Sequence, residues 1–194
     1  IDYSGTNPGA DLGDLSDNPD PTLANPDPYR VNYFKRTNNS EDDWSDLIRL
    51  TQKLAKGQSP TLDNPTWDPD YAEAVAQVAD VTQWMRFFAA NSIADNSETN
   101  LSNGRGDDYF MYFGRNDPRA ELTPYDLDTI FGRSSTSNSP THSLCLMCRN
   151  TLLTGSPPPP LNPFTNHPDF PPPSFAQLTR MLDGAFAPPT THPP

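Results

Sequence analysis

Residues 78–91 read Val-Ala-Asp-Val-Thr-Gln-Trp-Met-Arg-Phe-Phe-Ala-Ala-Asn, and their pattern predicts a core helix. Asp80 can cap the start of a helix, and apolar side chains occupy most of the positions after it. Because few polar positions remain, the pattern predicts a helix that is buried on most sides. We expect it to end near Ile93-Ala94, where the composition becomes polar.

An acidic loop and a hairpin follow this helix. The loop reads Asp95-Asn-Ser-Glu-Thr-Asn100, and a buried helix that ends in such a loop is a common support for catalytic side chains. After the turn at 103–106, the runs 109–113 and 120–123 predict two short strands joined by residues 114–119. The order is therefore helix, acidic loop, β-hairpin.

Two carboxylates come next, in the run Pro124-Tyr-Asp-Leu-Asp-Thr-Ile-Phe-Gly132. Asp126 and Asp128 follow a strand and precede a Phe-Gly break, so they can hold a divalent cation against phosphate oxygens. Phosphoryl transfer also needs an acid that receives the hydroxyl proton or orients the nucleophile, and Glu98 or Asp95 could fill that role. Asp-rich loops after strands are also ordinary turns, so the catalytic hypothesis and the turn interpretation both stay open.

Two more helices are predicted upstream. Ser40 is expected to cap a helix whose first turn is Glu41-Asp42-Asp43 and whose apolar positions recur at helical spacing until Gly57. Asp68-Pro69 repeats this start signal before a second apolar stripe, formed by Tyr71, Ala74, Val75 and Val78. With the hairpin, these helices predict an α+β fold that is mainly helical.

The flanks of this region are irregular. Residues 1–28 carry turn residues without apolar periodicity and predict an acidic loop or solvated linker. Residues 134–194 form a low-complexity, Pro-rich tail with one or two short helices, expected near 144–153 and 175–182. We therefore divide the chain into 1–28, 29–133 and 134–194.

Composition narrows the classes of function. Of 194 residues, 24 are proline, and 13 Lys and Arg face 25 Asp and Glu, which gives a net charge of −12. That field repels nucleic-acid phosphate and anionic lipid, so a nucleotide site would need a metal ion or a basic patch. No stretch approaches the ~20 apolar residues of a membrane span. The chain opens at Ile1 without Met or a signal region, so we expect an interior fragment of a longer protein.

Several other residues leave alternatives open. Cys145-Leu-Met-Cys148 is a lone C-x-x-C, compatible with incidental thiols, a local disulfide or a metal site. Trp84, Phe87 and Phe88 favour a core position over a ligand platform. Three arginines near the hairpin are either exposed turn residues or contacts for nucleotide phosphates, namely Arg105, Arg115 and Arg119.

Four segments in this order, the helix at 78–91, Asn96-Ser-Glu98, Asp108-Tyr-Phe-Met-Tyr112 and Pro124–Gly132, resemble the spore coat protein H (CotH) kinase family. The resemblance covers roughly residues 29–133. It implies the C-terminal lobe of an atypical bacterial protein kinase that is secreted or attached to the cell surface. Such a kinase uses ATP and a divalent cation, Mg²⁺ or another, to phosphorylate Ser residues of a partner protein.

The resemblance also implies roles for individual residues. The family's catalytic loop falls on Asn96-Ser97-Glu98, with Asp95 as a substitute acid after a small shift of the loop. Asn96 and Asp108 then contact the nucleotide, and Asp126 binds the metal. Asp128 is either a second ligand or an acid that orients the loop.

This sequence departs from the family pattern at two site residues and in its lysines. Glu98 replaces the usual Asp, and Asp108 replaces the usual Asn; a carboxyl displaced by about 1 Å can reduce turnover roughly 100-fold. The three lysines, Lys35, Lys53 and Lys56, do not lie in a strand behind a Gly-rich loop. We therefore expect an incomplete kinase, weak or inactive alone. The alternative is a non-catalytic binding or structural module of an extracellular multidomain bacterial protein.

Overall fold

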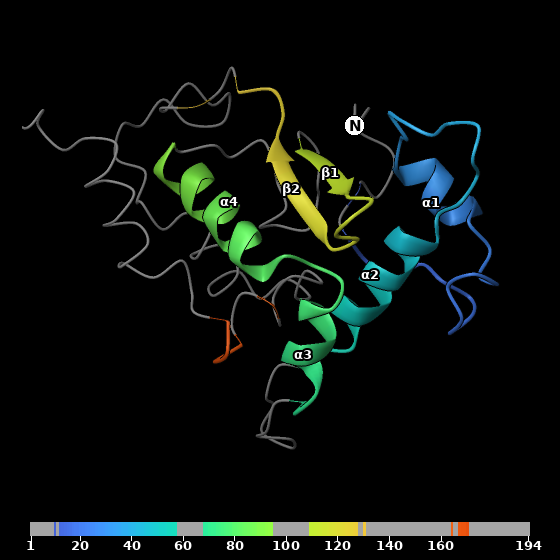
Figure 1. Ribbon diagram of the computed structural model, residues 1–194, viewed down its shortest axis with the longest axis horizontal. Helices are drawn as coiled ribbons and strands as arrows, with labels where there is room; N and C mark the ends of the chain where they lie inside the picture. The colour runs from blue at the N-terminus through green and yellow to red at the C-terminus, as the bar shows by residue number, and fades with distance from the viewer. Residues whose placement is uncertain are drawn as a thin grey trace, which may run out of the picture.

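The computed structural model describes residues 10, 12–57, 68–94, 109–127, 130, 164 and 167–170, with only the backbone of Ser92 and Ile93. These residues contain four helices and one antiparallel hairpin (Figure 1). The elements are α1 (Asp27–Asn32), α2 (Ser45–Ala55), α3 (Tyr71–Ala76), α4 (Val81–Ile93), β1 (Tyr109–Phe113) and β2 (Ala120–Pro124). The mixture of helices and strands agrees with the predicted α+β class.

Helix α4 forms where the sequence predicts it. The Asp80 carboxylate accepts the amide of Gln83 at 3.0 Å, which caps the first turn. Its core-facing side chains are almost inaccessible to solvent: Trp84, Met85, Phe87, Phe88 and Ala89. The aromatic residues therefore belong to the core, as expected, and the alternative of an exposed ligand platform is not realised.

The predicted start of α2 is wrong by four residues, because the helix begins at Ser45 rather than at Glu41. In a longer helix the Glu41 carbonyl would accept the amide of Ser45. Instead, Lys35 Nζ donates to the carbonyls of Glu41 at 2.5 Å and Asp43 at 2.9 Å. The Ser45 amide turns to the Asp43 carboxylate at 2.9 Å. Lys35, which precedes Glu41 by six residues, thus takes up a carbonyl that the predicted first turn of the helix would use.

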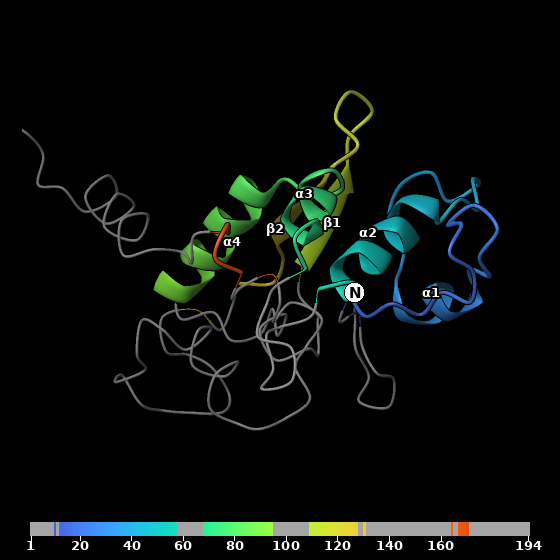
Figure 2. The same ribbon diagram turned by 90° about the horizontal axis from the view of Figure 1, so that it is seen from below.

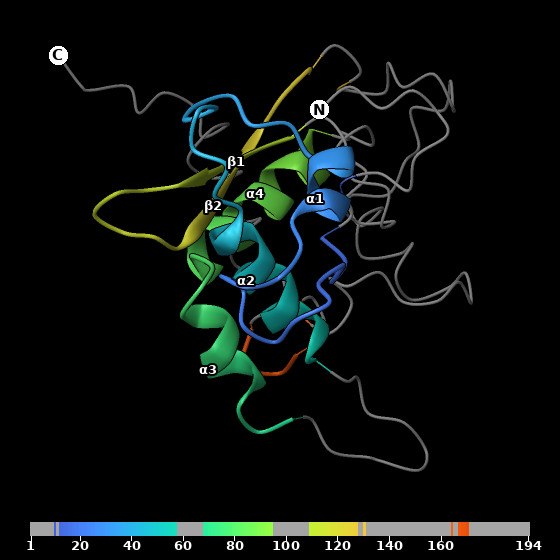
Figure 3. The same cartoon turned by 90° about the vertical axis from the view of Figure 1, so that its right-hand side faces the viewer.

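The segment before residue 29 is not entirely a solvated linker. It contains the start of α1, which the sequence analysis did not predict although Pro28 near its first turn is a typical start signal. Ala10 and Leu12 are fully buried. Leu12 also has a positive φ of 63°, an unfavourable conformation for an apolar residue that the packing around it must offset. This segment runs beside α2 (Figure 3). Gln52 of α2 donates to its Asn18 carbonyl at 2.7 Å.

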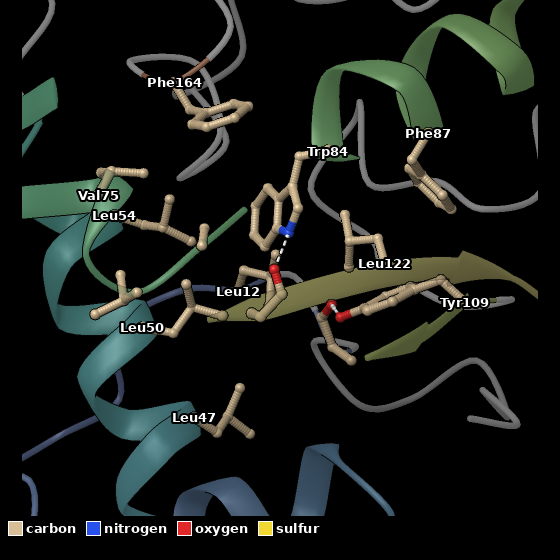
Figure 4. Packing of buried hydrophobic residues seen from close by; sticks show 14 of the residues in the cluster. Leu12, Leu47, Leu50, Leu54, Val75, Trp84, Phe87, Tyr109, Leu122 and Phe164 are labelled. Carbon is tan, nitrogen blue, oxygen red and sulfur yellow. Dashed lines mark hydrogen bonds between the residues drawn. The ribbon is translucent and has the colours of Figure 1, made fainter. Parts of the chain in front are cut away.

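Three tyrosine hydroxyls fasten this segment to the core. Tyr109 Oη donates to the Ala10 carbonyl at 2.7 Å (Figure 4). The amide of Leu12 donates to Tyr33 Oη at 3.0 Å, and the amide of Leu15 donates to Tyr29 Oη at 3.1 Å. Each hydroxyl forms a hydrogen bond with a backbone group of an irregular segment. These side chains therefore satisfy backbone groups that a neighbouring strand would satisfy in a sheet.

The Tyr109 contact gives a stability prediction. We expect Tyr109→Phe to lower the free energy of unfolding by about 1–2 kcal/mol, because the buried Ala10 carbonyl loses its donor. Urea denaturation measures this change. Tyr112→Phe is the matched control on the same strand, since Tyr112 is 60% exposed, and it should leave the urea midpoint unchanged. Equal losses in the two variants would contradict the role given to the Tyr109 hydroxyl.

The hairpin has the predicted strands and connection. Tyr109 pairs with Pro124, and Phe113 pairs with Ala120 at the closed end. A Cβ on Gly114 would lie 2.7 Å from the Asp117 carbonyl oxygen, so the connection requires glycine there. The hairpin lies between α4 on one side and α1 and α2 on the other (Figures 1 and 2).

Part of the predicted tail belongs to this core. Phe164 lies 5.3 Å from the Trp84 ring, and His167 and Phe170 lie 5.6 and 6.1 Å from the Tyr71 ring. Phe164, His167 and Phe170 are buried. The helices expected near 144–153 and 175–182 lie outside the described residues. The kinase-like lobe, the Pro-rich flanks and the division at 28 and 133 stay predictions.

Candidate functional site

Of the six predicted site residues, Asp126 is the one that the structure describes. The others lie outside the described residues, so their roles stay predictions: Asp95, Asn96, Glu98, Asp108 and Asp128. The described elements nevertheless end next to them in the chain. Helix α4 ends two residues before Asp95, β1 begins directly after Asp108, and β2 ends two residues before Asp126. Rigid elements therefore lead into each part of the predicted site.

Helix α4 and strand β2 are fixed to one another by hydrogen bonds. The amide of Ala120 donates to the Val78 carbonyl at 2.7 Å, and the amide of Asp80 donates to the Ala120 carbonyl at 3.0 Å, which forms a short parallel bridge. Trp84 Nε1 donates to the same carbonyl at 2.8 Å (Figure 4). The element that precedes the acidic loop and the element that precedes Asp126 thus form one joint.

Gln83 adds a second contact to this joint, one that the sequence analysis did not identify. Its Nε2 donates to the Leu122 carbonyl at 2.5 Å, and its Oε1 accepts the Leu122 amide at 2.9 Å. The signal in the sequence is the Asp-x-x-Gln spacing from Asp80, which is typical of a capping box. In a capping box the glutamine returns to the first residue of the helix, so the spacing alone does not point to β2.

Asp126 is exposed and has a positive φ of 50°. Aspartate tolerates this conformation better than most residues because its short polar side chain can bond locally. Its carboxylate is a hard oxygen donor, which suits Mg²⁺ as a single ligand. Within the described ranges, no group of three or more His, Cys, Asp or Glu could hold a metal ion. Asp126 fits one ligand position, and the described residues do not complete a metal site.

Next to Asp126 in the sequence, Tyr125 packs on a group of aromatic side chains that also contacts Arg36. The Tyr125 ring lies 4.7 Å from the Phe110 ring, and the Arg36 guanidinium lies 5.7 Å from Phe110 and 5.3 Å from Phe34. Arg36 forms no ion pair with the carboxylates of the described part of the chain. It therefore places a positive charge near the hairpin of a strongly acidic protein.

Of the three predicted turn arginines, Arg119 has a structural role. The Arg119 side chain donates three hydrogen bonds to the Asp117 carboxylate, at 2.6, 2.9 and 3.1 Å, and lies 3.6 Å from the Asp80 carboxylate. Arg115 is exposed, and Arg105 lies outside the described residues. The Arg119 side chain, helped by the Arg119 amide, lowers the pKa of Asp117 to about 2. The turn interpretation is confirmed for Arg119.

This ion pair predicts a pH dependence. The pKa of Asp117 is depressed in the folded state, so the pair stabilises the hairpin connection above the ordinary value of 3.8 and is lost as pH falls through about 2. We expect a carboxyl NMR titration of Asp117 to show a midpoint near 2. In Arg119→Gln the midpoint should rise toward 3.8, while Arg115→Gln should leave it unchanged. An unaltered midpoint in Arg119→Gln would refute this assignment of the cause.

Lys35 is a surface residue, as expected, but its ammonium is engaged. Besides the Glu41 and Asp43 carbonyls, it lies 5.6 Å from the Trp44 ring centre. These contacts use the charge to close the turn before α2. The Lys35 ammonium is thus already paired within the described residues.

The comparisons with known proteins agree with the resemblance drawn from the sequence. A family model described as CotH kinase protein matches residues 14–170, which is more than three quarters of the chain. No curated protein and no solved structure match the chain. In the described residues, no helix is long and apolar enough to cross a membrane. The family resemblance is thus confirmed, and the matched range extends past residue 133 to include the buried Phe164, His167 and Phe170.

Proposed function

We propose that this chain, which belongs to the CotH kinase protein family, contributes to the transfer of phosphate from Mg²⁺-bound ATP to Ser side chains of a partner protein. The family match over residues 14–170 carries this proposal. The joint between α4 and the hairpin supports it, because that joint gives the predicted loop and Asp126 a common rigid base.

In the proposed reaction, the Ser oxygen bonds to the γ-phosphorus while the bond between that phosphorus and the β–γ bridging oxygen breaks, and ADP leaves. Glu98 accepts the Ser proton, with Asp95 as the substitute acid. Asp126 is a metal ligand, and Asp128 is a second ligand or orients the loop. Asn96 and Asp108 contact the nucleotide. A bound Mg²⁺ neutralises charge on the phosphates, which a chain of net charge −12 needs.

The described residues also bear on how ATP is held. Arg36 is a cation near the hairpin that is not engaged by a described carboxylate, and it supports an anion-binding role for this side of the fold. Lys35 is engaged in a turn. We therefore propose that the lysine for the α and β phosphates comes from outside this chain and that the chain alone transfers phosphate weakly or not at all. We also place the protein at the cell surface or outside the cell.

The test is phosphoryl transfer by the full-length protein. It is incubated with γ-labelled ATP, Mg²⁺ and dephosphorylated casein as a Ser-containing probe, and phosphoserine on casein or on the protein itself is measured. We expect incorporation that EDTA abolishes. A folded full-length protein that incorporates no phosphate, and binds neither ATP nor Mg²⁺ by calorimetry, would instead favour the non-catalytic binding or structural module.

A further inference from the structure

Gln83 pairs with both backbone polar groups of one residue on β2. Its side-chain amide donates to the Leu122 carbonyl at 2.5 Å and accepts the Leu122 amide at 2.9 Å. An amide placed in this way satisfies a strand edge as a neighbouring strand would. Gln83 therefore extends the pairing of β2 by one residue beyond the backbone bridge at Ala120.

The capping geometry of α4 explains why this side chain is available. The Asp80 amide, to which a capping-box glutamine would return, already donates to the Ala120 carbonyl at 3.0 Å. The Asp80 carboxylate still accepts the Gln83 amide, so the helix start is satisfied without the Gln83 side chain. Both ends of that side chain are then free to bond Leu122.

The contact between Gln83 and Leu122 lies where the buried part of β2 ends. Leu122 is 1% exposed and is the last buried residue of β2, whereas residues 123–127 are all exposed. Burial therefore fixes β2 only as far as Leu122, four residues before Asp126. The Gln83 contact is the last hydrogen-bonded tie from α4 to β2 before that aspartate among the described residues.

We infer that Gln83 is a positioning residue for Asp126, setting the register of β2 on α4 and so the place from which Asp126 projects. The inference rests on the proposed function, in which Asp126 holds Mg²⁺ against ATP. Gln83 acts through the backbone of Leu122 and does not itself touch the metal or the nucleotide. Its loss should weaken the metal-dependent part of ATP binding more than it weakens the fold.

The chain offers a matched control in Gln52. Its Nε2 donates to the Asn18 carbonyl at 2.7 Å and to Ser16 Oγ at 2.9 Å, so, like Gln83, it is a glutamine whose side chain ties a helix to another segment of the chain. It joins α2 to the N-terminal segment, away from β2. Gln83→Met and Gln52→Met each keep the side-chain length and remove the hydrogen bonds.

The experiment uses the full-length protein and measures ATP affinity as a function of Mg²⁺ concentration, and again in EDTA, with thermal unfolding of each variant. We expect Gln83→Met to raise the half-saturating Mg²⁺ concentration about 10-fold, a change typical of losing an outer support of a metal ligand. In EDTA, the variant and the wild type should both bind ATP weakly or not at all. Gln52→Met should lower the melting temperature about as much as Gln83→Met does. It should leave the Mg²⁺ dependence of ATP binding unchanged.

The possible outcomes separate the positioning role of Gln83 from the proposed function. Unchanged Mg²⁺ dependence in Gln83→Met, or an equal change in both variants, would overturn the positioning role while the proposed function stands. Absence of Mg²⁺-dependent ATP binding in the wild-type protein would overturn the proposed function and this inference together. If Gln83→Met does not fold, Gln83→Glu keeps the acceptor for the Leu122 amide, and the same comparison with Gln52→Glu is made.

Discussion

Asp126→Asn is expected to reduce Mg²⁺-dependent ATP binding by about 100-fold or more. The substitution keeps the shape of the side chain and tolerates the positive φ of 50° at this position, so the turn after β2 should survive. It removes the carboxylate that we assign to the metal. Since loss of an outer support alone costs ~10–100-fold in metal affinity, loss of the ligand itself should cost at least as much. Calorimetric titration with ATP at fixed Mg²⁺ measures the effect.

Glu121→Gln is the matched control for this prediction. Glu121 is exposed on β2, the strand that leads to Asp126. Its substitution removes the same unit of negative charge as Asp126→Asn. Both variants therefore change the overall field of the protein equally. Glu121→Gln should bind Mg²⁺-ATP as the wild type does. Normal nucleotide binding in Asp126→Asn would mean that the metal is held elsewhere.

The largest effect on stability is expected at Trp84. Its ring is fully buried, lies 5.3 Å from Phe164, and donates through Nε1 to the Ala120 carbonyl at 2.8 Å. We expect Trp84→Ala to lower the free energy of unfolding by about 3–5 kcal/mol, because it leaves a large cavity between α4 and β2. That loss is a large part of the ~5–15 kcal/mol by which domains are stable. Urea denaturation monitored by circular dichroism measures it.

Trp44→Ala provides the comparison within the same chain. Trp44 is only half-buried, and its Nε1 donates at 2.9 Å to the exposed Asp42 carboxylate. Its loss should cost roughly 1 kcal/mol, as is usual for residues outside the core. If the two tryptophan variants lost equal stability, the α4–β2 joint would not be the centre of the fold.

The sequence predicted the elements whose signals are local. The apolar run after Asp80, the aromatic run at 109–113 and the alternating residues at 120–123 predict α4 and the hairpin, and the structure has both. Contacts between distant residues were not predictable in this way. Lys35 moves the start of α2 by taking carbonyls that a helix would use, and the buried Leu12 depends on a hydroxyl of Tyr33. Nothing in the spacing of either residue indicates its partner.

The candidate site divides in the same manner. The Asp-x-Asp pattern and the family resemblance pointed to Asp126, and the structure places that residue two residues after the end of β2. Gln83 was missed because its spacing from Asp80 is typical of a helix cap, whereas its partner Leu122 lies 39 residues away. Arg36 was missed because its place beside Phe110 on β1 depends on a contact between residues 74 positions apart in the sequence. Sequence patterns therefore identify a candidate metal ligand such as Asp126 better than they identify the residues that position it.

The most direct test of the central claim is the calorimetric titration of the folded full-length protein with ATP in the presence and absence of Mg²⁺. A CotH-family kinase site built around Asp126 predicts saturable binding with Mg²⁺ and little or none in EDTA, because the net charge of −12 opposes the free nucleotide. Binding that is equally strong in EDTA, or no binding at all with Mg²⁺ present, would contradict it.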